Sequence, residues 1–476
     1  MTDSLGERSM ISRQRPHWAV SALVVLWGCQ TVPDHDLVIR SVQVIDLVEG
    51  SSALADIGIN GERITAVSPG PLRGRSEVDG TGLWAMPGLW DMHVHIADPV
   101  YLDLMVANGV VGGRDMGGDS PHAGSGCGSL SIEQLRAWRH EIESGKRIGP
   151  RLQLAGPALV GTGWAPLAAV DEARTAVRQA AKRGSDFIKV HEGIPQDAFD
   201  AIMQEARASG LHVAGHVSEA TLSVLDSLRA GQRSVEHVRS NLIVCFARDD
   251  LELKSFYERD GWNDADRTWG NERRAECPEI WRELRQGHAW LGSTLAVERT
   301  QLDAAQPGFT GDSRRSRLPA SVQAGAAAHA ESVRARTPQQ ADEQEHWWQT
   351  QLAFVARARE EGARMISGSD AACEGVIPGY GLHDQLDLLV QAGLSPLEAL
   401  RTVTVEPAAY LGREADSGRI AENHVADIVL LRSDPRSNIA AIRDINAVVL
   451  RGHALGSDAL QEIKSAAAGG RASSIR

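Results

Sequence analysis

Short apolar segments alternate with amphipathic segments through the middle of this 476-residue chain. The apolar segments have the length of buried strands, and the segments between them, such as 171–184 and 196–210, have the apolar spacing of helices. Strands that alternate with helices form a parallel sheet with right-handed crossovers. The eight candidate strands are 87–96, 109–118, 151–159, 185–193, 211–217, 233–238, 288–297 and 363–371.

Eight strand–helix units over roughly 300 residues predict an α/β fold of the (β/α)8 TIM barrel type. An open, doubly wound sheet is the alternative, but no GxGxxG motif follows the first strand to support it.

Regions of short alternating strands flank this middle part. The first runs from about 36 to 85 and contains a hairpin signal at Asn60-Gly61. Similar sequence returns at 426–434 and 447–452, so we expect a small β-sandwich domain built from both chain ends. The expected boundaries are 1–28 for a signal peptide, 29–86 and 416–460 for the β-sandwich, 87–415 for the barrel with a tryptophan-rich insertion at about 247–348, and 461–476 for a disordered tail.

The first thirty residues have the layout of a secretory signal. Arg8, Arg13 and Arg15 precede an apolar stretch from Trp18 to Trp27 that is too short to span a membrane. Gly28-Cys29 then resembles a bacterial lipoprotein cleavage box, in which Cys29 becomes the acylated N-terminus. The sequence therefore predicts export to the periplasm and contact with the membrane only through a lipid anchor.

The net charge bears on the partners of the protein, and the cysteines bear on its disulfide bonds. A net charge of −13, without a lysine- or arginine-rich block, argues against a nucleic-acid or anionic-membrane partner. The partner that we expect is a small-molecule substrate. With Cys29 lipidated, four cysteines remain, which allow three disulfide connectivities. We predict a Cys245–Cys277 pair because Cys277 lies in the polar insertion and Cys245 lies at its start, and four unpaired thiols are the alternative.

Polar residues stand at the ends of several candidate strands. His93 and His95 are two residues apart, so on a strand both imidazoles face the same way and can hold one metal ion. The carboxyl ends of barrel strands gather at one face of the barrel. Four further candidate ligands end later strands: Lys189, His216, His237 and Asp370.

Each of these residues also has a simpler interpretation. His216 and His237 could be core histidines, Asp370 a turn cap, and Lys189 an ion-paired lysine, since an unpaired buried ammonium is costly. Six such residues at strand ends favour a metal site. Imidazole and carboxylate ligands suit divalent zinc.

The chain resembles the amidohydrolase superfamily, and in particular its imidazolonepropionase-like and Xaa-Pro dipeptidase-like branch, from about residue 37 to 455. The segments that carry the resemblance are PGLWDMHVHI, GVVGGRDMGG, GPRLQLAGPAL, DFIKVHEG, VAGHVSEA, GQRSVEHV, SGSDA, GLSPLEALRTVTVEPAAYLG and ADIVLL. The resemblance implies that His93, His95 and Asp370 bind a first metal ion. It implies that His216 and His237 bind a second ion, and that a carbamate formed from CO2 on Lys189 (N6-carboxylysine) bridges the two.

The resemblance further implies hydrolysis of a C–N bond, in an amide of a dipeptide or an N-acyl amino acid. Two divalent ions, zinc being expected, would provide a bridging hydroxide, and Asp370 would act as general base and then general acid. A cyclic amidohydrolase for imidazolones, hydantoins or lactams is one alternative, although Lys189 favours an enzyme that hydrolyses dipeptides or N-acyl amino acids. A catalytically silent binding lipoprotein is another alternative. The sequence does not decide whether the protein forms a homo-oligomer.

The sequence departs from the family in one respect. Many dipeptidase relatives carry a tyrosine shortly after the histidine that ends the fifth barrel strand. The corresponding segment here, Gly215-His216-Val217-Ser218, lacks it. His191, which shares a strand face with Lys189, is our candidate for the missing contact to the substrate.

Other polar and aromatic residues have structural alternatives. We expect Arg114 and Asp115 to form a buried pair beneath the site, and His212 to lie in the core or at the rim. The tryptophans of the insertion either wall a substrate pocket or pack the insertion on the barrel. Arginines at 273–274 and 314–315 are candidates for a substrate carboxylate, with exposed surface positions as the alternative.

Overall fold

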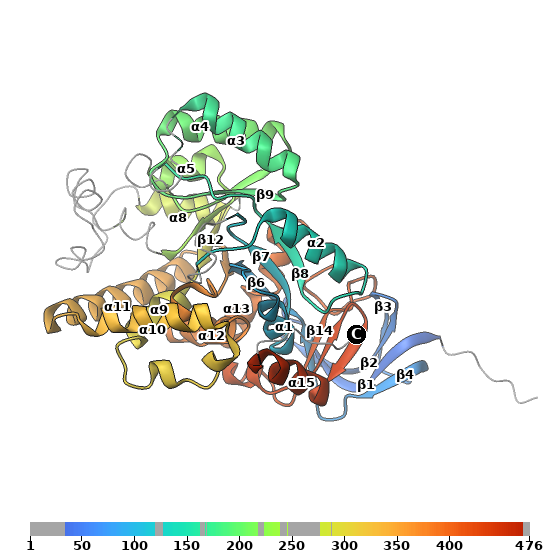
Figure 1. Ribbon diagram of the computed structural model, residues 1–476. Helices are drawn as coiled ribbons and strands as arrows, with labels where there is room; N and C mark the ends of the chain where they lie inside the picture. The colour runs from blue at the N-terminus through green and yellow to red at the C-terminus, as the bar shows by residue number, and fades with distance from the viewer. Residues whose placement is uncertain are drawn as a thin grey trace, which may run out of the picture. The chain divides into compact units, whose positions relative to one another are not determined.

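The computed structural model describes residues 34–119, 127–161, 167, 169–217, 223–238, 245, 277–286 and 288–469 (Figure 1). The predicted signal peptide, Cys29, Trp262, Trp269 and the arginines at 273–274 lie outside these residues. Within the described part, no helix combines the length and apolar character needed to cross a membrane.

Eight strands that follow the predicted order form two parallel sheets. Hydrogen bonds join β6 (Leu89–Val94), β7 (Val110–Asp115) and β8 (Arg151–Leu154). A second sheet contains β9 (Phe187–Val190), β10 (His212–Gly215), β11 (Ser234–Glu236), β12 (Trp290–Ser293) and β13 (Met365–Ser367).

Isolated parallel bridges connect the edges of these two sheets. Val94 pairs with Ala371 at one edge, and Ala155 pairs with Phe187 at the other. The α/β class is thus confirmed. Among the described residues the hydrogen bonding is interrupted rather than continuous around all eight strands, so a closed barrel stays a prediction.

Amphipathic helices follow the strands, as their spacing predicts. In α3 (Val170–Arg183), Ala173, Val177 and Ala180 are buried, and the helix ends at Gly184, whose φ of 88° suits a glycine. Helix α3 packs beside α4 (Gln196–Ala208) (Figure 1). The other described helices are α1 (Pro99–Ala107), α2 (Ile132–Glu143), α5 (Val224–Ala230), α8 (Cys277–Gln286), α9 (Leu295–Asp303), α10 (Ala320–Arg334), α11 (Pro338–Glu360), α12 (Tyr380–Gln391), α13 (Pro396–Arg401), α14 (Val405–Tyr410) and α15 (Ser457–Ala468).

Strands from both chain ends share one eight-stranded sheet. Its members are β1 (His35–Ile45), β2 (Ser52–Asn60), β3 (Arg63–Ser68), β4 (Gly74–Asp79), β5 (Trp84–Pro87), β14 (Ile428–Leu431), β15 (Ile445–Leu450) and β16 (His453–Gly456). Strand β5 pairs in parallel with β1 and antiparallel with β14. Because β5 joins the two halves, hydrogen bonds connect the described strands of both chain ends into one sheet, and the sandwich packing stays a prediction.

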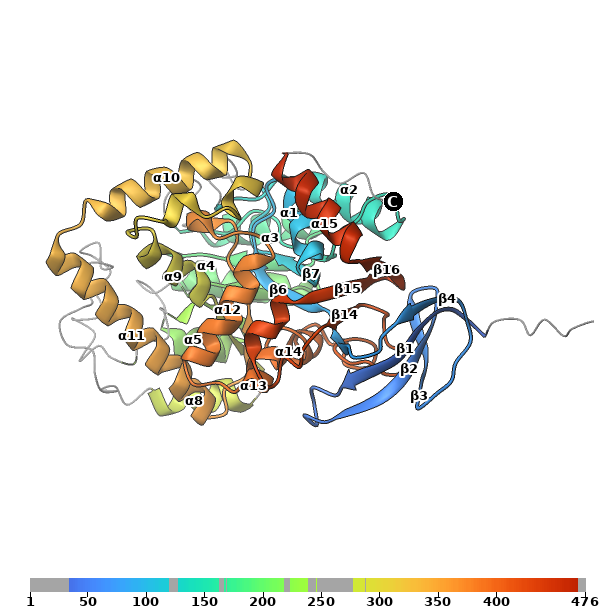
Figure 2. The same cartoon turned by 90° about the horizontal axis from the view of Figure 1, so that it is seen from below.

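The prediction of a disordered tail is wrong for residues 461–468. Helix α15 continues to Ala468 and buries Leu460, Ile463 and Ala467. These apolar residues share one helical face, which packs on α1 (Figure 2). Packing of this face against α1 orders a segment whose small and polar composition alone suggested disorder.

The described tryptophans of the insertion pack inside the protein. Trp281 is buried and lies with its ring centroid 4.8 Å from that of Phe354 on α11. Trp348, also on α11, is buried, and the Arg299 guanidinium lies 5.7 Å from its ring centroid. For these residues the packing interpretation holds.

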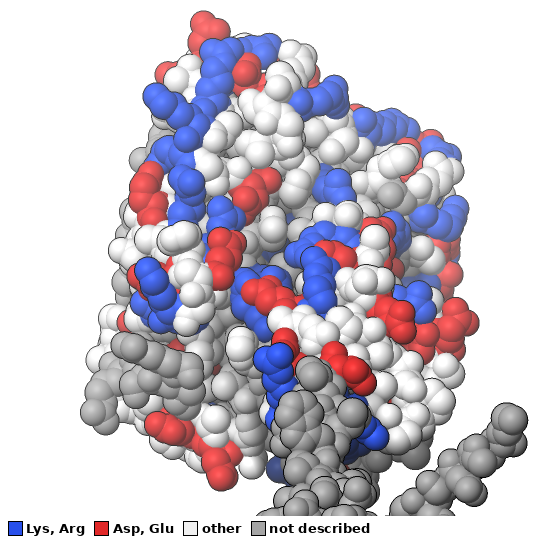
Figure 3. Space-filling model, turned by 90° about the vertical axis from the view of Figure 1, so that its right-hand side faces the viewer, with Lys and Arg blue, Asp and Glu red and all other residues white. Residues whose placement is uncertain are grey.

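On the face shown in Figure 3, acidic and basic side chains are interspersed.

A glycine sets the distance between β13 and β6. A Cβ built on Gly368 would lie 2.7 Å from the Cα of His93, deep inside van der Waals contact with the β6 backbone. We expect Gly368→Ala to destabilise the protein by about 1–3 kcal/mol, because backbone atoms cannot move aside as a flexible side chain can. Urea unfolding measures this change.

The matched control is Gly311→Ala, since a Cβ at Gly311 would meet nothing within 4 Å. Equal stability of the two variants would contradict this account of the β6–β13 contact.

Candidate metal centre

A cavity of about 320 Å³ lies where several parallel strands end. Its wall contains all six residues that the sequence predicted as metal ligands, together with His191. The six are His93, His95, Lys189, His216, His237 and Asp370. The structure therefore brings together residues that are separated by up to 277 positions in the chain.

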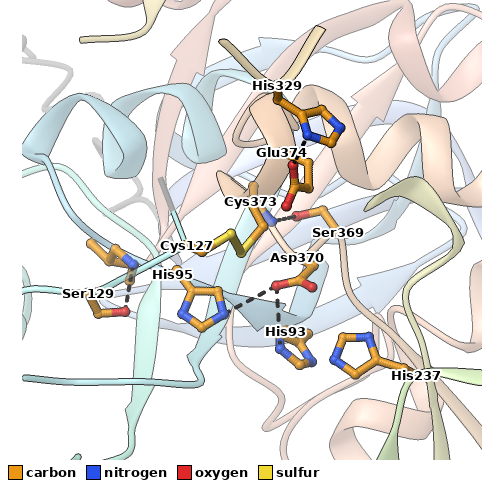
Figure 4. The surroundings of a disulfide bond; sticks show 12 residues. His93, His95, Cys127, Ser129, His237, His329, Ser369, Asp370, Cys373 and Glu374 are labelled. Atoms are coloured by element: carbon orange, nitrogen blue, oxygen red, sulfur yellow. Dashed lines mark hydrogen bonds and ion pairs between the residues drawn. A yellow bond between two sulfur atoms is a disulfide. The ribbon is translucent and has the colours of Figure 1, made fainter. Parts of the chain in front are cut away.

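His93, His95 and Asp370 form one cluster (Figure 4). The Oδ1 atom of Asp370 lies 3.5 Å from Nε2 of His93 and 3.2 Å from Nε2 of His95. Backbone hydrogen bonds hold this arrangement, because Asp370 N donates to His93 O at 2.8 Å and His95 N donates to Ala371 O at 2.6 Å. The chain leaving β13 thus runs along the end of β6 and presents Asp370 to both imidazoles.

His216 and His237 form the neighbouring cluster. They follow β10 and β11 directly, and their Nε2 atoms lie 3.0 Å apart. Nδ1 of His237 lies 2.6 Å from Oγ1 of Thr294, and Nε2 is the nitrogen that faces His216. The ring of His191 stacks on His216 with 3.9 Å between centroids, which places this predicted substrate contact beside the second cluster.

Lys189 lies on β9 in the wall of the same cavity and is only 2% exposed. Burial lowers the pKa of its ammonium group to about 8, although Glu236 and Asp370 favour the charged form. A neutral amine is therefore accessible near neutral pH. Burial also lowers the pKa of His93 to about 4, so this imidazole is neutral and able to bind metal.

The donor atoms fit divalent metal ions. Ligand atoms of His93, His237 and Asp370 lie within 4.8 Å of one another, and so do those of His191, Glu192 and His216. Oδ1 of Asp370 is buried and accepts no hydrogen bond of good geometry from the described residues. Burial acts to raise the pKa of Asp370, but the surrounding imidazoles, His93 first, hold it below its usual range. Asp370 is therefore ionised and able to bind a metal ion.

A buried ion pair lies beneath the first cluster. Arg114 Nη2 donates to Glu236 Oε1 at 2.6 Å, and Glu236 Oε2 lies 3.0 Å from Nδ1 of His93. Arg114 is 0% exposed and Glu236 is 1% exposed. Burial acts to raise the pKa of Glu236, but Arg114 and His93 outweigh it and hold the pKa well below its usual range.

The predicted Arg114–Asp115 pair is wrong, and Glu236 was missed. Asp115 instead accepts hydrogen bonds from the backbone of Ile96 at 2.9 Å and Gly117 at 3.1 Å. Adjacent residues on a strand point to opposite faces, so Arg114 and Asp115 cannot meet. A glutamate inside the apolar segment 233–238 was the available signal, because a buried carboxylate needs a cationic partner.

The remaining predicted residues lie away from the ligand clusters. His212 packs in the core against Phe187, with 5.4 Å between ring centroids. Arg314 pairs with Asp312 and Asp384 and does not line the cavity. Arg315 donates to the backbone of Phe309 and Gly375.

The cysteines form two bonds in the structure. Cys245 is paired with Cys277, the pairing that the sequence predicted, with 5.2 Å between Cα atoms. Cys127 is paired with Cys373, with 4.2 Å between Cα atoms. Both Cys127 and Cys373 line the cavity.

Comparisons with known proteins agree with this site. Residues 324–455, which include Asp370, match the model of the amidohydrolase family. Ochratoxinase from Aspergillus niger is 22% identical over 433 residues, which cover 76% of this chain and 73% of that protein. Adenine deaminase 1 of Rhizobium meliloti (strain 1021) is 43% identical over 61 residues, so the match spans only 11% of that protein and 13% of this chain.

Solved structures share the fold over most of the chain. A Xaa-Pro dipeptidase with bound methionine in its active site has a TM-score of 0.62 and 18% identity, covering 88% of this chain and all of that one. Bottromycin amidohydrolase has a TM-score of 0.68 and 21% identity, covering 91% and 90%.

The family match confirms the predicted resemblance to the amidohydrolases within residues 324–455, and the solved structures confirm that the chain shares their fold. The family match supports a hydrolase that acts on C–N bonds.

The buried pair beneath His93 leads to a test. Glu236→Gln keeps the side-chain shape but leaves the buried Arg114 cation without a counter-charge. Removing one partner of a buried pair costs about 3–5 kcal/mol, and loss of a hydrogen bond to a metal-binding histidine lowers metal affinity about 10–100-fold. Urea unfolding and zinc titration measure the two effects.

Glu205→Gln is the control, because Glu205 pairs with the exposed Arg178 at 2.9 Å. We expect that variant to lose at most about 1 kcal/mol of stability and to bind zinc as the wild-type protein does. If Glu236→Gln behaved like Glu205→Gln, the pair would not support His93.

Proposed function

We propose that this protein is a metal-dependent amidohydrolase that cleaves the amide bond of a dipeptide or an N-acyl amino acid. One observation carries the proposal: four imidazoles, a carboxylate and a buried lysine from five different strands converge on one cavity. A binding protein has no need for such a set of metal donors. A catalytically silent lipoprotein is therefore disfavoured.

The two clusters divide the ligands between two metal ions. His93, His95 and Asp370 would hold the first ion, His216 and His237 the second, and a carboxylated Lys189 both. Zinc suits these nitrogen and oxygen donors. When bound, such ions acidify a water molecule and polarise the carbonyl group that it attacks.

The environment of Lys189 supports its carboxylation. The nucleophile toward CO2 is the neutral amine, and burial lowers the pKa of this lysine to about 8. Nitrogen forms a bond to carbon and loses a proton, so a buried cation becomes an anion. That anion suits a position among imidazoles that bind metal.

Asp370 is positioned to move the proton. Because the surrounding imidazoles keep its pKa low, the carboxylate is ionised and can accept a proton from the attacking water. It then donates this proton to the departing nitrogen. His191, stacked on His216 in the cavity wall, is positioned to contact the substrate.

The cavity wall favours a substrate with a free amino group. Among its described residues are the carboxylates Glu192 and Glu298, and no arginine. Asp119 and Glu374 also line the cavity, but they pair with Arg183 and His329. Carboxylates attract the ammonium group of a dipeptide, which an N-acyl amino acid lacks. We therefore place dipeptides first.

We also propose that the protein is exported. The arginines before the apolar stretch and the Gly28-Cys29 sequence support a lipid-anchored protein that faces the periplasm. A dipeptidase there would act on peptides before their uptake.

The function is tested with a panel of dipeptides, N-acyl amino acids and cyclic amides. We expect hydrolysis of dipeptides that is lost after dialysis against a chelator and restored by zinc with bicarbonate. Liberated amino acids are measured by chromatography. Cleavage of cyclic amides alone would favour the alternative activity, and turnover unaffected by metal removal would exclude the metal-dependent mechanism.

Asp370→Asn separates catalysis from metal binding. Asparagine keeps the shape and one ligand oxygen but cannot accept the proton, and general acid–base groups contribute about 10²–10⁴-fold. We expect kcat to fall by that factor while metal content changes little. Glu374→Gln is the control, because Glu374 also lines the cavity but pairs with His329 at 2.8 Å. A kcat within a few-fold of wild type for Asp370→Asn would move the proton route to another residue.

A further inference from the structure

The Cys127–Cys373 disulfide lies at the edge of the candidate metal centre (Figure 4). Cys373 follows Asp370 by three residues, and its backbone N donates to Asp370 O at 2.9 Å. Cys127 stands near Ser129, whose Oγ accepts a hydrogen bond from Ile96 N at 3.2 Å beside the end of β6. The bond thus joins two segments that both border the first metal cluster.

Cys373 is close enough to share a metal ion with this cluster. Its sulfur, a nitrogen of His95 and a carboxylate oxygen of Asp370 lie within 4.8 Å of one another, and Cys373 and Asp370 are buried. Oδ1 of Asp370 is buried and lies 3.2 Å from Nε2 of His95, and both residues are candidate ligands of the first metal ion. A free thiolate of Cys373 would add a third donor beside these two residues.

Cys245 and Cys277 have no such surroundings. Neither belongs to any of the metal-ligand groups found among the described residues, and neither lines the cavity. This second disulfide is therefore an internal control.

We propose that Cys127 masks a metal-binding thiol: when the Cys127–Cys373 bond is reduced, Cys373 joins His95 and Asp370 as a ligand of the first metal ion. The inference rests on the proposed metal site. With the bond closed, the sulfur of Cys373 is covalently satisfied and cannot act as a thiolate. The disulfide therefore keeps a soft ligand away from a site built from nitrogen and oxygen donors.

The chemistry requires a reductant such as a thiol or a phosphine. With a phosphine and water, the S–S bond breaks, two thiols form and the phosphine becomes its oxide. The Cys373 thiol then loses its proton to solvent as sulfur binds the metal. An extra thiolate ligand would occupy a position that the substrate or the reacting water needs.

This arrangement couples activity to the compartment. Disulfides form in the oxidising periplasm and are rare in the cytosol. Before export, the thiolate would block the metal; after export, bonding to Cys127 would release it. The proposed peptidase would thus stay inactive among cytosolic peptides.

Cobalt substitution tests the inference without relying on activity. Thiolate ligation to Co²⁺ gives a near-ultraviolet charge-transfer band, whereas nitrogen and oxygen ligands give only the weaker visible bands. All proteins carry Cys29→Ser to remove an unrelated thiol. We expect the charge-transfer band in Cys127→Ser, and its loss in Cys127→Ser/Cys373→Ser.

A second variant tests the same inference if Cys127→Ser does not fold. In Cys245→Ser/Cys277→Ser, the Cys127–Cys373 bond is the remaining disulfide among the described cysteines. Treatment with a phosphine, followed by its removal, should produce the same band in this protein, and reoxidation should abolish it.

The outcomes separate the two proposals. Visible cobalt bands without a charge-transfer band in either arm would overturn the masked thiol and leave the metal-dependent function intact. An oxidised wild-type protein that binds no cobalt would overturn the metal site itself, and the masked thiol with it.

Discussion

The candidate metal centre depends on a buried ion pair between Arg114 and Glu236. Two charges removed from water are tolerated only when they are paired and hydrogen bonded. Here Glu236 accepts hydrogen bonds from Arg114 and Ser234, and its second oxygen lies 3.0 Å from Nδ1 of His93. The pair therefore connects β7 and β11 with β6 and leaves Nε2 of His93 facing Asp370. Without this support, the His93 imidazole loses the contact that orients its ring.

The second constraint is the tight path of the chain beyond the strands. His237 and Asp370 have φ values of 66° and 58°, a region that side chains other than glycine rarely adopt. Such backbone persists when its surroundings fix it, and it occurs often at functional sites. Asp91 contributes here, because its carboxylate accepts hydrogen bonds from the backbone and hydroxyl of Ser369, next to Asp370. Burial raises the pKa of Asp91 to about 6.

Features that depend on residues close together in the sequence could be predicted from the sequence alone. His93 and His95 stand two residues apart at the end of an apolar strand, and Lys189, His216, His237 and Asp370 end later strands, so strand geometry alone brought them to one face. Other features depend on contacts far along the chain. The Cys127–Cys373 bond spans 246 residues, and helix α15 is ordered by packing on α1, so neither was predicted. Glu236 was missed because its partner Arg114 lies on another strand.

The most direct test of the account is a crystal structure of protein prepared with zinc and bicarbonate, with data collected at the zinc absorption edge. The account predicts two anomalous peaks, one beside His93, His95 and Asp370 and the other beside His216 and His237. It also predicts electron density for a carbamate on Lys189 between them. A single peak with an unmodified lysine would contradict the two-metal centre, and the absence of any peak in the cavity would contradict a metal-dependent hydrolase.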